Sequence, residues 1–251
     1  MSILKMIFYQ PLYNGLILIY NFIPGHDLGI AIILLTIIIR FVLYPLNSLS
    51  IRSQKALQDI QPKIKQVQKE FANNKEQQAK ELLKLYKEHK VNPFSSCLPL
   101  LIQLPFLIAL FSVFKTGITD TAFADLYSFV GRPEAINYIS FGFLDIAHAS
   151  PILAIVAAGL QFWQTRMLMH SKVPHPKSDG KDEGKDEAFA ATMNKQMMYI
   201  APVMTVVIGW TLPSGLMVYW TVSTIFSIIQ QYIVFKRHAK ESRLGGTTVT
   251  S

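Results

Sequence analysis

The chain has 251 residues, of which 51% are hydrophobic and 16% charged, and its formal net charge is +8. Soluble domains usually carry about 25% charged residues, so this composition argues against a soluble globular protein. The charges gather in a few polar blocks between long apolar runs, a pattern typical of a protein with several membrane spans. The single cysteine, Cys97, excludes an intramolecular disulfide and a cysteine-rich metal site.

Residues 1–27 precede the first long apolar run, and we expect them to form an extracytoplasmic segment. They show neither the cleavage site of a secretory signal nor an Arg- and Ser-rich transit segment, which favours a bacterial membrane over an organelle. An aromatic and apolar stretch within them is broken by Pro11, Asn14 and Gly15. We interpret this stretch as an amphipathic helix on the outer membrane interface, with a sixth span as the alternative.

Five apolar runs follow, each close to the roughly 20 residues that cross the core of a bilayer. They predict an all-α polytopic membrane protein with five transmembrane helices, an amphipathic N-terminal interfacial helix and a cytoplasmic antiparallel helical hairpin. The expected spans are residues 28–47, 93–116 and 150–170, with the fourth and fifth together at 197–235.

The basic residues predict which connections face the cytoplasm. Lysine and arginine are frequent in residues 48–92, in 171–196 and in the tail 236–251, whereas the loop 117–149 contains only Arg132. The positive-inside rule therefore places the N-terminus outside and the C-terminus in the cytoplasm, in the plasma (inner) membrane of a bacterium. The loop 171–196 is of low complexity and balanced in charge, so we expect it to be flexible.

Residues 48–92 are predicted to form the helical hairpin. Apolar residues recur at helical spacing on both sides of Asn73 and Asn74, and these two asparagines mark a tight turn. Its lysines could bind partners, and a solvated hairpin without a binding role is the alternative. The lysines assigned to this surface are Lys63, Lys65, Lys69, Lys80 and Lys84.

Arg40 is the residue that points most specifically to a functional site. It lies about twelve residues into the first span, roughly 18 Å along a helix axis. Its guanidinium stays charged, and a charge in mid-span costs about 2.5–3.5 kcal/mol on insertion scales. Arg40 could reach the inner headgroups, pair with an acid or face water, but the predicted spans contain no Asp or Glu. A water-filled cavity is therefore the favoured interpretation, with snorkelling as the alternative, and Thr36 would share the face of Arg40.

Other spans add polar side chains without a fixed negative charge. Any one of them could simply bond a neighbouring helix, whereas together with Arg40 they indicate a hydrated pocket lined by hydrogen-bonding groups. They are Gln103, Gln161, Gln164, Thr221 and Ser223, with Trp163, Tyr219 and Trp220 as amphipathic edges.

Three motifs carry a family resemblance: TIIIRFVLYPL at residues 36–46, CLPLLIQLP at 97–105 and LPSGLMVYW at 212–220. In this order and spacing they resemble the YidC/Oxa/Alb insertases, in the minimal five-span form of a bacterial YidC, over residues 28–235. The resemblance implies a membrane protein insertase and chaperone that is not an enzyme and has no cofactor. It implies nascent membrane proteins and the lipid bilayer as partners, with the Sec translocon, ribosome and targeting factors as further candidates, and a functional monomer.

The resemblance also assigns roles by position. Arg40 matches the family's groove arginine, Thr36 the polar residue one turn before it, Gln103 the second-span glutamine and Trp220 an aromatic position of the last span. Gln164 matches the groove glutamine of the third span, with Gln161 as competitor, and Tyr219 and Ser223 are further groove candidates. The family's groove is open to the cytoplasm and to lipid and closed to the outside. One departure is Ser95-Ser96, where the family usually has glycine.

Two other classes of function compete with an insertase. An anion-selective channel or small-solute transporter could use Arg40 for selection, but no inverted repeats or paired broken helices are visible. An intramembrane enzyme would need a Ser/His pair or a cluster of metal ligands, and the sequence suggests neither. No Gly-rich phosphate loop is present, so we expect no nucleotide hydrolysis.

Overall fold

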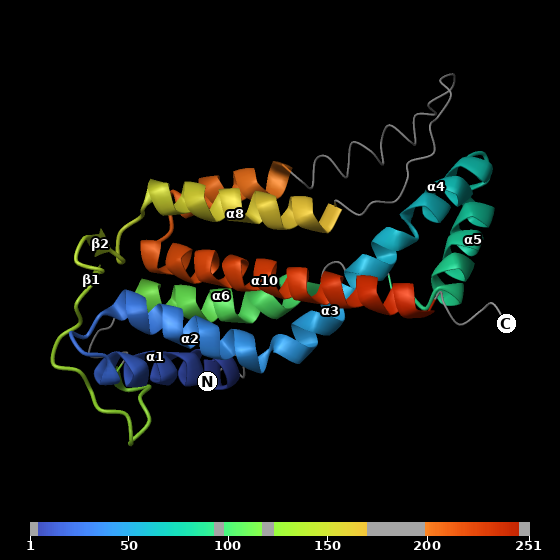
Figure 1. Cartoon of the computed structure of the whole chain (residues 1–251). Coiled ribbons are helices and arrows are strands. Elements are labelled where there is room, and N and C mark those ends of the chain that lie inside the picture. Colours follow the sequence, from blue (N-terminus) through green and yellow to red (C-terminus); the bar gives the residue numbers. More distant parts are fainter. Residues whose placement is uncertain (1–4, 93–97, 117–122, 170–198, 246–251) are drawn as a thin grey trace. The chain divides into compact units, whose positions relative to one another are not determined.

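The computed structural model describes residues 5–92, 98–116, 123–169 and 199–245 (Figure 1). These residues are mostly helical, as predicted, and include one two-stranded β-sheet. The predicted flexible loop 171–196 lies outside the described residues. The chain divides into two compact units. The first consists of Met1–Tyr44, Pro99–Gln161 and Pro202–Ser227, and the second of Pro45–Leu98, Phe162–Ala201 and Ile228–Ser251.

The first unit is built from helices that carry long apolar runs. A short π-helix, η1, leads directly into α1, and α2, α6, α8, an unlabelled helix and α10 follow along the chain. Their bounds are Lys5–Tyr9 for η1, Gln10–Phe22 for α1, Leu28–Val42 for α2, Leu98–Thr116 for α6, Pro151–Met169 for α8, Tyr199–Gly209 for the unlabelled helix and Ser214–Gly245 for α10. The ends of α8 and α10 extend into the second unit.

The helix α2 has distinct start and stop signals. Asp27 caps it, because its carboxylate accepts a hydrogen bond of 3.1 Å from the backbone N–H of Ile30. The helix ends at Val42, where Pro45 follows within three residues; a proline at that position cannot donate to the carbonyl of Phe41, and its ring crowds that carbonyl. The predicted first span, 28–47, is therefore divided between α2 and the next helix.

The core of the first unit lies where α1 packs on α2. Tyr13, Leu16 and Ile17 of α1 are fully buried and Tyr20 is 1% exposed, against Leu28 and its neighbours on α2. Residues of α6 and of the start of α10 complete the same cluster. The apolar face of α1 is thus covered by protein.

A loop following α6 is hydrogen-bonded to α1 at two positions along the helix. Asn14 donates to the carbonyl of Asp125 at 3.0 Å and accepts from the N–H of Tyr127 at 2.6 Å. Tyr20 donates its hydroxyl hydrogen to the carbonyl of Ala135 and accepts from the N–H of Asn137. These bonds link residues more than a hundred positions apart, so they hold the loop over α1 as a strap.

The β-hairpin in this loop consists of β1 (Ile139–Ser140) and β2 (Leu144–Asp145), which pair antiparallel. It lies where α2 begins: the N–H of Gly29 donates to Ser140 Oγ at 2.8 Å. A Cβ on Gly29 would lie 2.7 Å from the Cβ of Ser140, so only glycine allows this approach.

The same hairpin also holds the start of α10. Ser214 Oγ donates to the carbonyl of Asp145 at 2.6 Å, and the N–H groups of Ser214 and Gly215 donate to His148 and Ile146. The helix α8 begins three residues after His148, so α2, α8 and α10 all begin beside the hairpin (Figure 1). The hairpin therefore sets the register between the helices that carry the candidate site.

The second unit contains α3 (Tyr44–Asp59) and a helical hairpin formed by α4 (Gln61–Glu70) and α5 (Lys75–Glu88). Asn74 caps α5 through the N–H of Gln77, at the turn that the two asparagines predict. Lys63, at the start of α4, lies 3.1 Å from the ring of His89, which follows the end of α5, so the two helices run antiparallel.

Among the described residues, one helix, Ser214–Arg237, is long and apolar enough to span a membrane by itself. A second candidate arises only if α2 and α3 are taken together as one broken span. Gln103–Phe114 and Tyr199–Gly209 are shorter apolar helices. The number of spans therefore remains a prediction.

Candidate functional site

Three helices of the first unit contribute one polar side chain each to a continuous hydrogen-bonded chain. Arg40 of α2 donates from Nη2 to Gln103 Oε1 of α6 at 2.8 Å. Gln103 donates from Nε2 to the hydroxyl oxygen of Tyr219 of α10, also at 2.8 Å. Both bonds have the length of well-formed hydrogen bonds, and the first involves a charged donor. The amide of Gln103 thus joins the charge of Arg40 to the last helix.

The end of α2 favours a cation at position 40. Arg40 lies in the last turn of this helix, two residues before Val42. The free carbonyl groups of a helix C-terminus carry partial negative charge, which stabilises a nearby cation. Arg40 is partly buried, and among the described residues its hydrogen-bond partner is the neutral Gln103 rather than an acid. Its positive charge is therefore solvated by dipoles but not neutralised.

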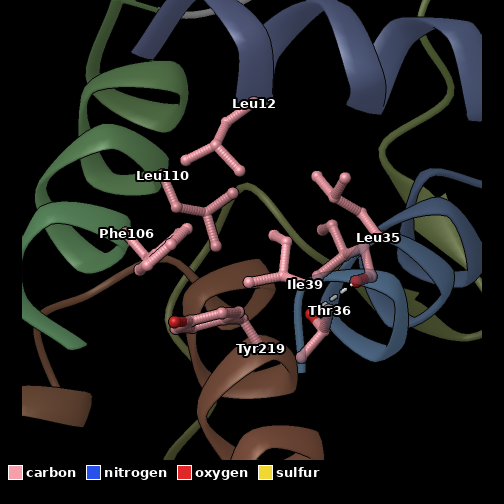
Figure 2. A pocket seen from close by; sticks show the side chains of 8 residues that line it. Leu12, Leu35, Thr36, Ile39, Phe106, Leu110 and Tyr219 are labelled. Carbon is pink, nitrogen blue, oxygen red and sulfur yellow. Dashed lines mark hydrogen bonds between the residues drawn. The ribbon is translucent and has the colours of Figure 1, made fainter. Parts of the chain in front are cut away.

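Thr36 lies one turn before Arg40 and is 1% exposed. Its hydroxyl donates to the carbonyl of Ile32 at 2.6 Å, so its hydrogen is used within its own helix. Thr36 and Tyr219 both border a small cavity, which Figure 2 shows enclosed mainly by apolar side chains from α1, α2 and α6. Its volume of about 10 Å³ is near the minimum that holds one water molecule. The lining residues are Leu12, Ile32, Leu35, Thr36, Ile39, Phe106, Leu110 and Tyr219.

The other predicted groove residues lie in different surroundings. Gln161 accepts a hydrogen bond from Thr205 of the helix Tyr199–Gly209. Ser223 is 2% exposed, one turn beyond Tyr219, and its hydroxyl has no hydrogen-bond partner among the described residues. Trp220 is partly buried, and its carbonyl accepts from Thr224. Gln164 is also partly buried and belongs to the second unit.

Sequence analysis missed a set of buried polar residues in the second unit. Gln230 of α10 donates to Ser48 Oγ of α3 at 2.9 Å. The spacing of Asn47, Ser50 and Gln54 could have revealed them, because polar residues three and seven positions apart share one face of a helix. The buried members of this set are Asn47, Ser50, Gln54, Gln230 and Gln231.

The predicted partner-binding lysines lie on both helices of the hairpin α4–α5. Four of the five are exposed, and Lys65 is partly exposed. Two have acidic neighbours: Lys80 pairs with Glu76 at 2.6 Å, and Lys84 with Glu81 at 3.8 Å. Exposed pairs of this kind contribute little to stability, so these lysines keep their freedom to contact a partner.

Nothing in the described part of the chain points to a bound metal. Within it, no group of three or more His, Cys, Asp and Glu side chains could hold a metal ion.

Comparison with known proteins gave one family and several relatives. The model of the 60Kd inner membrane protein family matches residues 18–241. A protein of Fusobacterium nucleatum named membrane protein insertase YidC is 32% identical over 213 residues, or 85% of this chain and 88% of the relative. A Clostridium perfringens protein of the same name is 34% identical over 244 residues, or 96% of this chain and 93% of the relative.

One solved structure is also similar. It is described as an active YidC insertase crystal structure with the first transmembrane domain resolved, and it is 26% identical to this chain with a TM-score of 0.58. The alignment covers 92% of this chain and 47% of the solved chain, so this chain spans about half the length of that protein.

Proposed function

Because the chain belongs to the 60Kd inner membrane protein family of YidC/Oxa/Alb insertases, we propose that it inserts other proteins into the bacterial inner membrane and helps them fold. The observation that carries the proposal is the hydrogen-bonded chain of Arg40, Gln103 and Tyr219. A charge held inside an apolar helical unit is expensive, and intramembrane charges of this kind mark functional sites.

In this proposal the chain crosses the membrane five times, with its N-terminus outside. Arg40 forms the centre of a hydrophilic groove that opens to the cytoplasm and to lipid. The strap of bonds from the loop to Asn14 and Tyr20 supports a closed outer side. Thr36 and Tyr219 belong to the groove wall, and Gln164, Trp220, Gln161 and Ser223 remain further candidates.

Arg40 would act on the polar end of a client protein. An acidic leader is attracted to an unneutralised guanidinium, and the attraction is stronger in a partly buried site than in bulk water. Gln103 holds the guanidinium through a neutral acceptor, so the charge stays available to the client. Bare polar groups in lipid are costly, so a groove that replaces their hydration lowers the barrier to crossing.

The apolar segment of the client would then leave sideways into lipid. Its burial supplies the driving force, at roughly 25 cal/mol for each Å² of apolar surface removed from water. No nucleotide hydrolysis is needed in this scheme. The lysine-bearing hairpin α4–α5 and the basic end of α10 would recruit ribosomes, targeting factors, the Sec translocon or anionic lipids.

The test is insertion of a short single-span client with an acidic leader into liposomes that contain this protein and no Sec components. Wild type should insert the client, Arg40→Lys should keep most of the activity and Arg40→Ala should lose it. Arg52→Ala is the matched control, since it removes an exposed arginine from α3. Undiminished insertion by Arg40→Ala would show that the charge of Arg40 plays no part in insertion.

The same liposomes separate an insertase from an anion-selective channel or small-solute transporter. A chloride flux that needs Arg40, without any insertion of the client, would favour the channel. We expect insertion without such a flux.

A further inference from the structure

Four phenylalanines of the first unit are exposed around the loop that follows α6. Phe143 is 82% exposed, Phe22 80% and Phe129 73%, and Phe141 is 39% exposed. Phe141 and Phe143 flank Gly142 at the tip of the β-hairpin, and their ring centroids lie 6.4 Å apart. A pair of neighbouring, exposed aromatic rings such as Phe141 and Phe143 indicates a contact surface rather than a surface that faces water.

The backbone holds the hairpin tip in a conformation that a bulky residue rarely adopts. Phe141 has a φ of 57° and Gly142 a φ of 79°, both in the left-handed region. This region suits glycine but is disfavoured for phenylalanine. Backbone strain of this kind persists where the surrounding structure fixes it, often at functional positions. Here it presents Phe143 outward.

The depth of the tip is fixed relative to the start of α2. The N–H of Phe141 donates to the carboxylate of Asp27 at 2.7 Å, and Ser140 accepts from the N–H of Gly29. The end of α1 is tied to the same loop, because Asn21 donates to the carbonyl of Gly131 at 2.6 Å. The four phenylalanines therefore lie at the level where helices of the first unit begin.

The residues around the hairpin tip indicate that this exposed surface contacts lipid. Exposed apolar residues continue from it along α2 as Ile30, Leu34 and Ile38, without a polar band between them. One nearby carboxylate already has a partner, because Asp145 is bonded to His148 at 2.7 Å. Exposed Phe, Trp and Leu side chains bury themselves at the boundary between the headgroups and the acyl chains of a bilayer.

We propose that Phe22, Phe129, Phe141 and Phe143 form an aromatic anchor that inserts into the headgroup region of the outer leaflet. This surface goes beyond the insertion of clients, and it rests on the inner-membrane location of the family rather than on the groove. The anchor would fix the height of the β-hairpin in the bilayer. Through the bonds of that hairpin it would also fix the starts of α2 and α10.

The experiment places an environment-sensitive fluorophore on the anchor in the full chain. The single native cysteine is removed by Cys97→Ser, and Phe143→Cys or Glu134→Cys then provides the attachment site. Glu134 is the matched control because it is exposed on the same loop. Each protein is reconstituted into phospholipid vesicles with nitroxide labels at a shallow or a deep acyl position.

We expect the label at position 143 to be quenched most by the shallow nitroxide and shielded from aqueous iodide, and the label at position 134 to be reached by iodide. Equal access of iodide to both positions would overturn the proposal. So would shielding of position 143 that arises only after soluble proteins are added, because that result points to a protein partner.

A bulky fluorophore could itself draw position 143 into the bilayer. A small nitroxide side chain at the same two positions therefore serves as a second label, and its collisions with oxygen and with an aqueous nickel complex are measured. Higher oxygen access at position 143 than at 134 is the expected result, and higher nickel access there would contradict the anchor. The depth of the labels in the bilayer is measured without any client protein, so the result does not depend on whether the chain inserts clients.

Discussion

Arg40 and Gln103 lie 63 residues apart in the sequence, and the guanidinium of one donates to the amide oxygen of the other at 2.8 Å. This pairing orients the arginine without cancelling its charge, which a carboxylate would do. It also explains how an apolar helix can end with a cation: the dipole of α2 and the amide dipole together replace part of its hydration.

Gln103→Glu tests whether the uncancelled charge matters. Glutamate has nearly the shape of glutamine, and its carboxylate would lie at the oxygen that now accepts from Arg40. The resulting ion pair should reduce insertion of an acidic-leader client about tenfold, which corresponds to roughly 1.4 kcal/mol. Insertion rates in liposomes measure the effect, with Gln66→Glu at an exposed position of α4 as the control. Equal rates for wild type and Gln103→Glu would rule out this role of the charge.

Tyr219 is expected to act through its hydroxyl and through its packing. Tyr219→Phe leaves the Gln103 amide hydrogen without its acceptor, a loss of about 1–3 kcal/mol in a buried site. Tyr219→Ala also removes a ring that is only 4% exposed, and aromatic-to-alanine changes in a core cost about 3–5 kcal/mol. Thermal unfolding in detergent should rank the midpoints as wild type, Tyr219→Phe and then Tyr219→Ala. Identical midpoints for wild type and Tyr219→Phe would show that the bond contributes nothing.

Much of the helical architecture could be predicted from the sequence, since apolar runs, Asp27 and Pro151 mark where helices begin. Arg40 could be singled out because a charge within an apolar run is rare. Its partner could not be derived from spacing, because spacing shows which side chains share a face of one helix but not which helices meet. Gln103 and Gln161 are equivalent by that criterion, yet Gln161 bonds Thr205 and Gln103 bonds Arg40.

The β-hairpin was also beyond prediction. Its strands have two residues each, too few for the alternating pattern that identifies a strand. It is held by bonds to distant positions, such as the one between Gly29 and Ser140. By contrast, the break of the first predicted span after Val42 had a readable cause in Pro45.

Gly209 should tolerate no side chain. A Cβ there would lie 2.7 Å from the Cβ of Ala154 in α8 and 2.7 Å from the sulfur of Met217 in α10. Because the Cβ of Ala154 cannot move without its helix, Gly209→Ala should cost about 1–3 kcal/mol. Gly159→Ala is the control, since a Cβ there meets nothing within 4 Å and alanine favours a helix by about 0.5–1 kcal/mol. Thermal midpoints that move in the same direction for both variants would contradict this packing.

Asp27 should make stability depend on pH. Burial alone would raise its pKa, but hydrogen bonds from the N–H groups of Phe141 and Ile30 outweigh burial and hold the pKa below its usual value of 3.8. The folded state therefore binds this proton less readily than the unfolded state, so the stabilisation is complete above pH 3.8 and is lost as pH falls through the lowered pKa. Asp27→Asn should unfold at lower temperature than wild type at pH 7, and the gap should close in acid.

Glu134→Gln removes an exposed charge from the same loop and serves as the control for Asp27→Asn. A gap between wild type and Asp27→Asn that is unchanged at the lowest pH would show that the carboxylate is not what stabilises the start of α2.

The most direct test of the central claim varies the client rather than the protein. One single-span client is prepared with an acidic, a neutral or a basic leader, and its insertion rate is measured in liposomes with wild type or Arg40→Ala. An attractive, unneutralised Arg40 predicts that wild type inserts the acidic leader fastest and the basic leader slowest, and that Arg40→Ala loses this order. The same order of rates with both proteins would contradict a role for the charge of Arg40 in insertion.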